Sequence, residues 1–573
     1  MPAFVLLDHD EHARTVTLTD LDDGAHVLGT RTVPADGLPA EVARVEAGAA
    51  PGPGTSGGAP VRWVWDDTRR RYPPLLAAGV RVERCHDLRL CRTLLRHAVA
   101  AAGSALAGQP RAAWEDPPVP EPAHVPSLFD LLDEAPAAPT RQDAHPAGSP
   151  VDLLAELRTQ LDAVAGSTAP RRLRLLLAAE SGGALVAEEM HHDGLPWDPV
   201  VHDALLTELL GPRPAAGRPQ RLEDLAAQVR AALVAPRLNP DSPPDLLRAL
   251  RLQGFDLAST SKWEIGALDH PVVEPLLEYK RLSRLLSANG WAWLDAWVHD
   301  GRFRPTYVVG GVVTGRWATD GGGALQLPAA LRAAARADPG WRLVVADAAQ
   351  LEPRVLAAMS GDDAMAAAAR ASDLYQGIAD AGIVPTRKDA KYALLGAIYG
   401  ATTGASAMLM PRLTAAYPRA VALVEEAARA GERGEVVSTW LGRSSPPGAQ
   451  ALLDDLAAAR SEGASAQDVR EARRRARDRG RFTRNFVVQG TAAEWALCWL
   501  ASLRRRLHAL PGRPHLVYFL HDEVVVHTPE EVADDVAVAV RESAAEAGRL
   551  LFGDRPVEFA LDLAVVGSYA DAG

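Results

Sequence analysis

Cysteine and lysine are scarce in this sequence of 573 residues, and long apolar runs are missing. Three scattered cysteines, Cys85, Cys91 and Cys498, cannot build a disulfide framework or a four-ligand zinc site, which indicates a reducing cytoplasm. We find neither a signal peptide at the start nor an apolar run of membrane-spanning length. The sequence therefore predicts a cytoplasmic protein that makes no membrane contact.

Positive charge is also in the minority, with 61 Lys and Arg residues against 73 Asp and Glu and a formal net charge of −12. This balance excludes a protein coated uniformly for nucleic acid, so any such contact must come from a local basic patch. The best candidate is residues 470–484, REARRRARDRGRFTR, with eight arginines and two acids. Asn485 and Gln489 follow Arg481 at four-residue spacing and offer amides for base edges. A solvated, charged helix explains the arginines equally well.

Only four of the 61 basic residues are lysines, and two of these lie within residues 387–400, RKDAKYALLGAIYG. Arg387, Lys391, Leu395 and Tyr399 recur every four positions, which places them along one face of a helix. A lysine in an arginine-rich protein indicates a point cation rather than a planar fork. The stretch predicts a helix that holds a triphosphate at one end and a base at the other, with a solvated basic face as the alternative.

Chain length and composition divide the sequence into several domains. The segments AFVLL and RTVTLTDL predict a strand pair with a charged turn that opens a small α/β domain. An Ala-, Pro- and Gly-rich stretch at 103–150 predicts a flexible linker, and helical periodicity follows it. Further on, TYVVGGVV and WRLVVAD predict strands. Ser259-Thr260-Ser261-Lys262 predicts a polar turn that grips a phosphate, or equally an ordinary helix cap.

Two aspartates occupy rigid positions beside apolar strands. Asp347 closes the strand LVVAD, and Asp522 lies at a tight turn between the strands HLVYFL and VVVHT. If the two strands are neighbours, the aspartates can share a pair of Mg²⁺ ions for in-line phosphoryl displacement. Each aspartate alone is more often a turn residue or a helix cap.

Together these stretches resemble the family-A (DNA polymerase I type) DNA polymerases, in order from about residue 180 to the C-terminus. Residues 347–354, DAAQLEPR, resemble the family's first motif, residues 387–400 the second, and His521-Asp522-Glu523 the third. Shorter segments agree: TGR with a following LQ resembles the primer–template segment, residues 481–493 resemble the template-side helix, and STSK resembles part of the thumb.

The resemblance implies an α/β protein with a right-hand polymerase fold of palm, fingers and thumb, preceded by a small RNase H-like α/β domain of the 3′–5′ exonuclease type. The expected domains are 1–102 exonuclease-like, 103–150 linker, 151–304 connecting helices and thumb, 305–365 first part of the palm, 366–499 fingers and 500–573 second part of the palm. A separate 5′-nuclease domain has no room.

The resemblance also implies the site residues. Two Mg²⁺ ions, for which Mn²⁺ can substitute, are expected at Asp347 and Asp522, with Glu523 assisting catalysis. The expected nucleotide site comprises Arg387, Lys391, Leu395, Tyr399, Glu352, Gln350 and His521, with Glu352 excluding ribose. The expected DNA site comprises Thr314, Arg316, Gln326, Arg481, Asn485, Gln489, Ser259, Thr260 and Lys262.

Several positions depart from the family pattern. Leu395 stands where the family usually has Phe or Tyr, which removes a ring from the nucleotide pocket, and Ala348-Ala349 replace the usual Tyr-Ser beside the first aspartate. The N-terminal part has aspartates such as Asp8 and Asp66 but no convincing Asp-x-Glu pair, so we predict an inactive exonuclease domain.

The predicted protein is thus a monomeric, nucleoid-associated DNA polymerase that binds primer–template DNA and dNTPs and acts in replication or repair. Two alternatives remain: a non-catalytic DNA-binding homologue, and a polymerase that still proofreads. Within the expected linker, Leu128 and Phe129 loosely resemble the motifs that tether replication proteins to the sliding clamp, but the usual initial glutamine is absent. Docking of this segment within the chain is the alternative.

Overall fold

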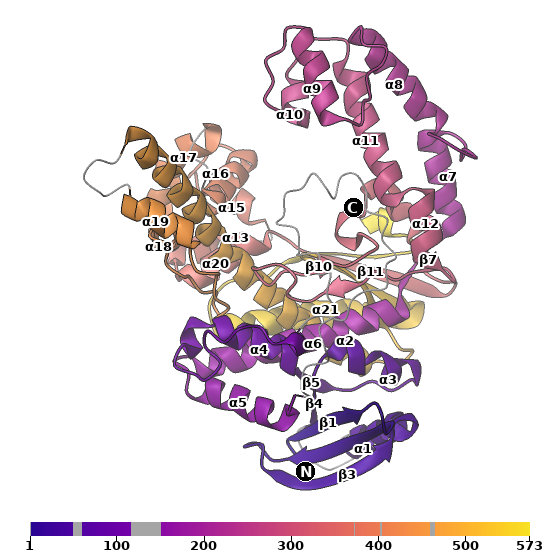
Figure 1. Ribbon diagram of the computed structural model, residues 1–573, viewed down its shortest axis with the longest axis vertical. Helices are drawn as coiled ribbons and strands as arrows, with labels where there is room; N and C mark the ends of the chain where they lie inside the picture. Colours follow the sequence, from indigo (N-terminus) through magenta and orange to yellow (C-terminus); the bar gives the residue numbers. More distant parts are fainter. Residues whose placement is uncertain are drawn as a thin grey trace.

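The computed structural model describes residues 2–49, 60–115, 151–371, 373–400, 404–458 and 465–572. Figure 1 shows two groups of helices, one magenta and one orange, rising from opposite ends of a central sheet, with the indigo N-terminal strands below it. This arrangement matches the expected thumb, fingers, palm and small α/β domain. The segment with Leu128 and Phe129 lies outside the described residues, so the clamp contact stays a prediction.

The N-terminal domain is built on a five-stranded sheet of order β3-β2-β1-β4-β5. Strand β1 pairs antiparallel with β2, as the sequence predicts, and parallel with β4, which is itself parallel to β5. The carboxyl ends of β1, β4 and β5 therefore lie at one edge of the sheet. The elements are β1 (Phe4–Asp10), β2 (Thr15–Leu21), β3 (Val27–Pro34), α1 (Leu38–Ala49), β4 (Arg62–Trp65), α2 (Thr68–Arg71), α3 (Pro73–Ala77), β5 (Arg84–Asp87) and α4 (Leu88–His97).

The chain stays folded beyond residue 102, so the expected linker from 103 begins too early. Leu106 and Glu115 are fully buried. The Glu115 carboxylate accepts hydrogen bonds from Arg92 Nε (3.2 Å) and pairs with Arg96 Nη2 (3.5 Å). Two arginines of α4 thus hold this segment, a tertiary contact that composition does not reveal.

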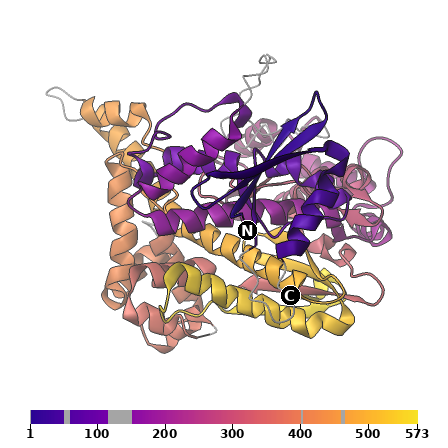
Figure 2. The same cartoon turned by 90° about the horizontal axis from the view of Figure 1, so that it is seen from below.

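The next two helices, α5 (Leu153–Ala165) and α6 (Pro170–Asp193), join the N-terminal domain to the rest of the protein. Leu153 and Leu157 of α5 are buried in one cluster with Leu6 and Val64 of the sheet, so α5 completes the N-terminal domain rather than the thumb. More than half of the residues of helix α6 are buried, because it packs against both β5 and α20 (Ala466–His508). Figure 2, the view from below, draws the N-terminal elements across the underside of the palm.

Six helices form the thumb. Two of these helices have a polar N-cap. Asp198 caps α7 and Ser242 caps α9, and in each helix a proline follows at the first helical position. The helices are α7 (Pro199–Leu210), α8 (Gln220–Ala232), α9 (Pro243–Leu252), α10 (Lys262–Gly266), α11 (Val273–Asn289) and α12 (Trp291–Trp297).

The palm is a four-stranded antiparallel sheet of order β12-β13-β11-β14, with α21 packed against it. Its elements are β11 (Trp341–Ala348), β12 (His515–Leu520), β13 (Glu523–Pro529), α21 (Ala533–Phe552) and β14 (Leu561–Val566). Two smaller sheets lie beside it, formed by β6 (Leu195–Pro196), β7 (Val298–His299), β8 (Arg302–Phe303), β9 (Tyr307–Val308) and β10 (Ala318–Thr319). The expected strand TYVVGGVV is thus only two residues long, because Gly310 takes a positive φ and turns the chain.

The fingers consist of helices from both sides of α16, the helix predicted from the four-residue ladder. They are α13 (Leu351–Ser360), α14 (Asp363–Ala368), α15 (Leu374–Asp380), α16 (Arg387–Tyr399), α17 (Gly404–Ala416), α18 (Pro418–Glu432) and α19 (Gln450–Ala458).

Helix α20 continues from the fingers into the palm, so the expected domain boundary at 499/500 falls inside it. A capping box of Ser465 and Asp468 starts this 43-residue helix. Of the described residues, it is the one helix long and apolar enough to cross a membrane, but 89% of its apolar window is buried inside the protein. Its apolar composition is that of a core helix.

Candidate active site

Strand pairing in the palm brings the two distant aspartates together. Asp347 is opposite Glu523 in the β11–β13 ladder, and Asp522 immediately precedes Glu523. The N–H of Ala348 donates to the backbone oxygen of Asp522 (2.9 Å), which fixes the hairpin tip against the end of β11. His521 takes a positive φ of 60° at this tip and is exposed. The strands that carry the two aspartates are therefore neighbours, as the prediction of a shared metal site requires.

Both carboxyl groups have raised pKa values. Burial, followed by the charge of Asp347, raises the pKa of Asp522 to about 7. Burial, followed by the charges of Glu523 and Asp562, raises the pKa of Asp347 to about 6. Negative charge is therefore concentrated at the ends of three adjacent strands, β11, β13 and β14, and a cation would relieve the repulsion.

Glu523, expected to assist catalysis, is held in place by Arg332. Its carboxylate accepts a hydrogen bond from Arg332 Nη2 (3.3 Å), and the Arg332 guanidinium lies over the Tyr569 ring, 4.3 Å from its centroid. Glu523 is 8% exposed. It contributes charge next to Asp347 while its own position is set by Arg332.

The donor set fits a hard divalent cation. Carboxylate oxygens are the ligands that Mg²⁺ prefers, and its sites use one or two carboxylates together with substrate phosphates and water. Among the described residues, no three His, Cys, Asp or Glu side chains converge to hold a metal. Asp347 and Asp522 would therefore hold the ions jointly with the substrate.

Helix α16 presents the predicted ladder on its exposed face. Arg387, Lys391 and Tyr399 are exposed and Leu395 is half-buried. The opposite face packs into the core through Ala390, Ala393, Leu394, Gly396, Ala397 and Ile398. The Thr386 side chain caps the first turn by accepting from the N–H of Asp389, and Gly400 ends the helix with a positive φ of 72°. The cationic end and the aromatic end of the ladder are thus fixed in one rigid element.

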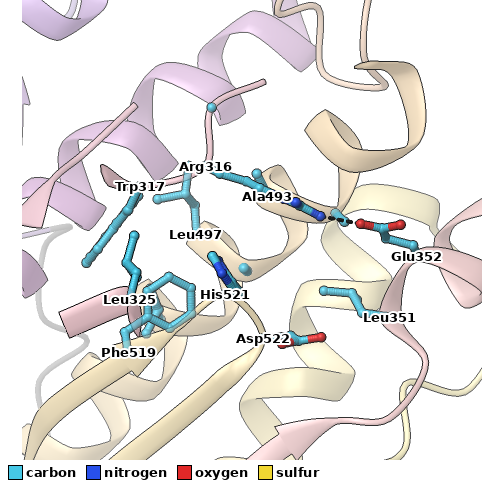
Figure 3. A pocket seen from close by; sticks show the side chains of 14 residues that line it. Arg316, Trp317, Leu325, Leu351, Glu352, Ala493, Leu497, Phe519, His521 and Asp522 are labelled. Carbon is cyan, nitrogen blue, oxygen red and sulfur yellow. Dashed lines mark hydrogen bonds and ion pairs between the residues drawn. The ribbon is translucent and has the colours of Figure 1, made fainter. Parts of the chain in front are cut away.

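Glu352 links the palm to the far end of this helix. Tyr399 Oη donates to Glu352 Oε2 (2.5 Å), and Arg316 pairs with Oε1 of the same carboxylate. Figure 3 shows the Arg316–Glu352 pair at one side of a pocket, with His521 and Asp522 below. Apolar side chains of Trp317, Leu325, Leu497 and Phe519 line the rest of this pocket. An anion and a cation therefore stand at the mouth of an apolar pocket next to Asp522.

Gln350 has a different environment from the one expected for a nucleotide ligand. Its side-chain oxygen accepts from the N–H of Leu374 (2.8 Å), and its Nε2 donates to Asp373 Oδ1 (3.0 Å). Gln350 takes a positive φ of 57° at the start of α13. In this structure it ties the first palm motif to α15.

The residues expected to hold DNA fall into two groups. Around α20, Thr314 Oγ1 and Asn485 Oδ1 are buried and have no hydrogen-bond partner within the described parts of the chain, Gln326 accepts from Arg284 Nη2 (3.5 Å), and Arg481 pairs with Asp478. Gln489 hydrogen-bonds to Tyr399. Thr314 and Gln326 adjoin the pocket residues Gly315 and Leu325 in sequence, and the unpartnered oxygens are consistent with a polar ligand.

In the thumb, the STSK turn already holds an anion from its own chain. The Glu264 carboxylate accepts from the N–H groups of Ala258 (2.9 Å) and Ser259 (3.0 Å) and from the Ser259 hydroxyl. Ser261 caps α10, and Thr260 accepts from Lys280. The helix-cap interpretation therefore describes this turn, and Lys262 is left exposed on the first turn of α10.

Sequence reasoning missed three groups of the site, and one of them, Asp562, reaches it only through long-range strand pairing. Asp562 lies opposite Asp347 in the β11–β14 ladder. Arg354 is 1% exposed and donates to the backbone oxygens of Ala349 (2.8 Å) and Glu558 (2.7 Å), which fixes the turn after β11. Asp373 holds Arg387 through an Nε–Oδ2 contact of 2.5 Å. For Arg354, its position within the first family motif was the available signal.

Known proteins resemble this chain in sequence and in fold. The model of DNA polymerase family A matches residues 219–566. DNA polymerase I of Chloroflexus aurantiacus is 28% identical over 337 residues, which cover 53% of this chain and 33% of that protein. The thermostable DNA polymerase I of Thermus filiformis is 29% identical over 317 residues, or 50% of this chain and 35% of that protein. The matched region thus spans about a third of the length of these curated relatives.

Among solved structures, the polymerase domain of Pol1 from M. smegmatis, in complex with DNA primer–template and dNTP, superposes with a TM-score of 0.62 at 18% identity. The alignment covers 99% of this chain and 95% of that one, so the fold is shared along its whole length, N-terminal domain included. The family match covers well over half of the sequence and includes all three motifs of the site. The chain belongs to DNA polymerase family A.

Proposed function

We propose that this protein is a template-directed DNA polymerase that joins dNTPs to a primer 3′-hydroxyl and releases pyrophosphate. The observation that carries the proposal is the junction of Asp347 and Asp522 at one end of the palm sheet, each with a raised pKa. The names of the matched relatives and the primer–template and dNTP bound to the M. smegmatis neighbour support it.

The chain's own residues supply binding, orientation and charge. Asp347 and Asp522 would hold two Mg²⁺ ions, whose charge would help to activate the attacking oxygen and to stabilise the leaving one. Arg387 and Lys391 neutralise the triphosphate from α16, and Glu352 crowds the position of a ribose 2′-hydroxyl. Arg316, Asn485 and Gln489 hold the duplex near its growing end. This division suits phosphoryl transfer, in which positioning and charge stabilisation do most of the work.

Primer extension with Mg²⁺ and four dNTPs tests this proposal. Wild type is expected to extend the primer, and Asp522→Ala to lower the rate by about 10³-fold or more. Asp380→Asn, an exposed carboxylate at the end of α15, is the matched control and is expected to behave as wild type. Failure of wild type to extend in either Mg²⁺ or Mn²⁺ would instead favour a non-catalytic DNA-binding homologue.

We also infer that the N-terminal domain is inactive as a nuclease. The acids at the shared edge of β1, β4 and β5 are engaged by cations and amides of the same domain. Arg71 makes a two-point pair with Asp66 (Nε–Oδ1 2.7 Å, Nη2–Oδ2 2.9 Å), and Arg89 Nε lies 2.9 Å from Asp67 Oδ2. Asp87 caps α4 by accepting the N–H of Leu90 (2.8 Å). Guanidinium groups thus neutralise Asp66 and Asp67, two of the acids that a divalent ion would need at this edge.

A 3′-mismatched primer incubated without dNTPs checks this inference. No shortening is expected with either Mg²⁺ or Mn²⁺. Metal-dependent shortening that disappears in Asp8→Ala or Asp66→Ala would show that the domain still proofreads.

A further inference from the structure

Arg387, the first rung of the nucleotide ladder, is held in place by residues outside α16. Its Nε donates to Asp373 Oδ2 (2.5 Å), and its guanidinium carbon lies 5.8 Å from the ring centroid of Tyr375. The Arg387 side chain is still 52% exposed. It is therefore anchored near its base while much of the group faces solvent.

Asp373 is itself fixed by contacts from two directions. Its Oδ1 accepts from the N–H of Gln376 (3.1 Å), so it caps α15, and also from Gln350 Nε2 (3.0 Å). Although burial works in the opposite direction, the hydrogen bond from Arg387 lowers the pKa of Asp373. Because the Asp373 carboxylate accepts three hydrogen bonds, it stays ionised and its position is fixed. The position of the Arg387 side chain is therefore set by Asp373.

Because Arg387 contacts Asp373 through Nε, its terminal nitrogens remain available to bind a phosphate. A guanidinium has five N–H donors in one plane, and its two terminal nitrogens match two oxygens of a phosphate. An arginine bound to a carboxylate through Nε keeps at least one terminal nitrogen directed away from that carboxylate. Fixing the side chain beforehand also removes part of the rotamer entropy that binding would otherwise cost.

Gln350 connects this anchor to the metal-binding strand. It lies three residues after Asp347, and its side chain contacts both Asp373 and the N–H of Leu374. Asp347 and Arg387 are thereby connected through three residues of backbone and two hydrogen bonds, Gln350 to Asp373 and Arg387 to Asp373.

We propose that Asp373 is a positioning residue for nucleotide binding: it orients Arg387 through Nε so that the terminal nitrogens meet the triphosphate, and Tyr375 supports the guanidinium from its face. The ligand is the triphosphate of an incoming dNTP, so this inference deepens the function proposed above and rests on it. Asp373 touches neither nucleotide nor metal and acts through Arg387.

Single-nucleotide incorporation by Asp373→Asn tests the proposal. The amide keeps the size and one acceptor oxygen but loses the charge that orients Arg387. We expect the KM for dNTP to rise about ten-fold, while kcat and the KM for primer–template change less than about two-fold. Inhibition by pyrophosphate, which carries phosphates alone, is expected to weaken by a similar factor. Tyr375→Leu is expected to raise the KM for dNTP less than Asp373→Asn, and Tyr375→Phe, which keeps the ring, to leave it unchanged.

Two further measurements separate positioning from a general structural effect. In an Arg387→Lys background, which lacks the planar fork, Asp373→Asn is expected to change the KM for dNTP less than about two-fold. Asp380→Asn is the matched control. Asp380 ends α15, the helix that Asp373 caps, and its carboxylate accepts from Gln376 Nε2 (2.7 Å) and not from Arg387.

The outcomes against the proposal are distinct. An unchanged KM in Asp373→Asn overturns it, and a lower KM would mean that Asp373 competes with the triphosphate for Arg387. An equal effect in the Arg387→Lys background would show that Asp373 does not act through Arg387. If wild type does not extend primers at all, the polymerase function fails; the Kd of a dNTP on a dideoxy-terminated primer–template then still reports whether Asp373 affects nucleotide binding.

Discussion

Two aspartates determine how the active site responds to pH. The pKa values of Asp522 (about 7) and Asp347 (about 6) in the folded protein exceed those of an unfolded chain. The native state therefore binds protons more tightly, and these groups destabilise the metal-free protein at a pH above their folded values. The destabilisation is relieved as pH falls through about 7 and then 6.

We therefore expect Asp522→Asn to stabilise the metal-free protein by about 1–2 kcal/mol at pH 8 and by much less at pH 5. Added Mg²⁺ should stabilise wild type more at pH 8 than at pH 6, because bound metal and protons compete for the same oxygens. Thermal unfolding with and without Mg²⁺ measures both effects, with Asp380→Asn as the control. A Mg²⁺ response that persists in Asp522→Asn would place the metal elsewhere.

Glu352 offers a second prediction at this scale. Its carboxylate is shared between Arg316 and Tyr399, so its position is fixed on both sides. We expect Glu352→Ala to increase rNTP incorporation relative to dNTP by at least about ten-fold, because removing the side chain opens space at the sugar. Incorporation of single rNTPs and dNTPs measures this ratio. Tyr399→Phe keeps the carboxylate and is expected to change the ratio far less; an equal effect would mean that the hydrogen bond and not crowding discriminates.

Local signals revealed some of these residues and concealed others. Asp347 and Asp522 could be predicted because a carboxylate at a strand end or hairpin tip is visible in a few neighbouring residues. Asp562 could not be predicted because it reaches the site through the pairing of β11 with β14. Arg332 could not be predicted because its place depends on a contact with Tyr569, which is distant in sequence. Gln350 was assigned to the nucleotide by resemblance, and the structure engages its side chain with α15 instead.

At the scale of elements, α20 supports a prediction about salt. Arg481 is exposed on this helix, whereas Arg484, three residues later, is buried and donates to the backbone oxygen of Ala397 (2.9 Å). We expect Arg481→Ala to weaken binding of primer–template DNA of any sequence and to reduce the salt slope by about 1, since one phosphate contact is lost. Titrations over a range of salt concentrations measure the slope, with Arg541→Ala of α21 as the control.

An unchanged slope would support the alternative that the arginine-rich segment is a solvated helix face. The sequence could not separate the two because both interpretations need the same periodicity. Elements whose identity depends on periodicity over many residues, such as α16, were predicted well. Short ones were not: TYVVGGVV has the composition of a strand, but Gly310 and Gly311 turn it, and Val312 and Val313 are left exposed.

At the scale of the whole molecule, one buried cluster joins the N-terminal domain, α6 and α20. Arg504 of α20 donates from Nη2 and Nε to the two oxygens of Glu189 (2.7 and 3.0 Å) and from Nη1 to the backbone oxygen of Glu83 (2.9 Å). Tyr72 Oη donates to the same carboxylate (2.5 Å). Burial alone would raise the pKa of Glu189, but the charges of Arg504 and His508 hold it well below its usual range. Neighbours this distant in sequence cannot be paired by local reasoning.

This cluster predicts that the N-terminal domain is an integral support of the rest of the protein. Removing Arg504 leaves the Glu189 charge buried with only the weaker contacts of Arg81 and His508 (3.6 Å each), so Arg504→Met should cost about 3 kcal/mol. Arg504→Met combined with Glu189→Gln should recover much of that loss, because an uncompensated charge costs more than a missing pair. Chemical denaturation followed by tryptophan fluorescence measures both variants. If the double variant is no more stable than Arg504→Met, the cost lies in lost packing of the arginine and not in the buried charge, and the junction is held by shape rather than by the ion pair.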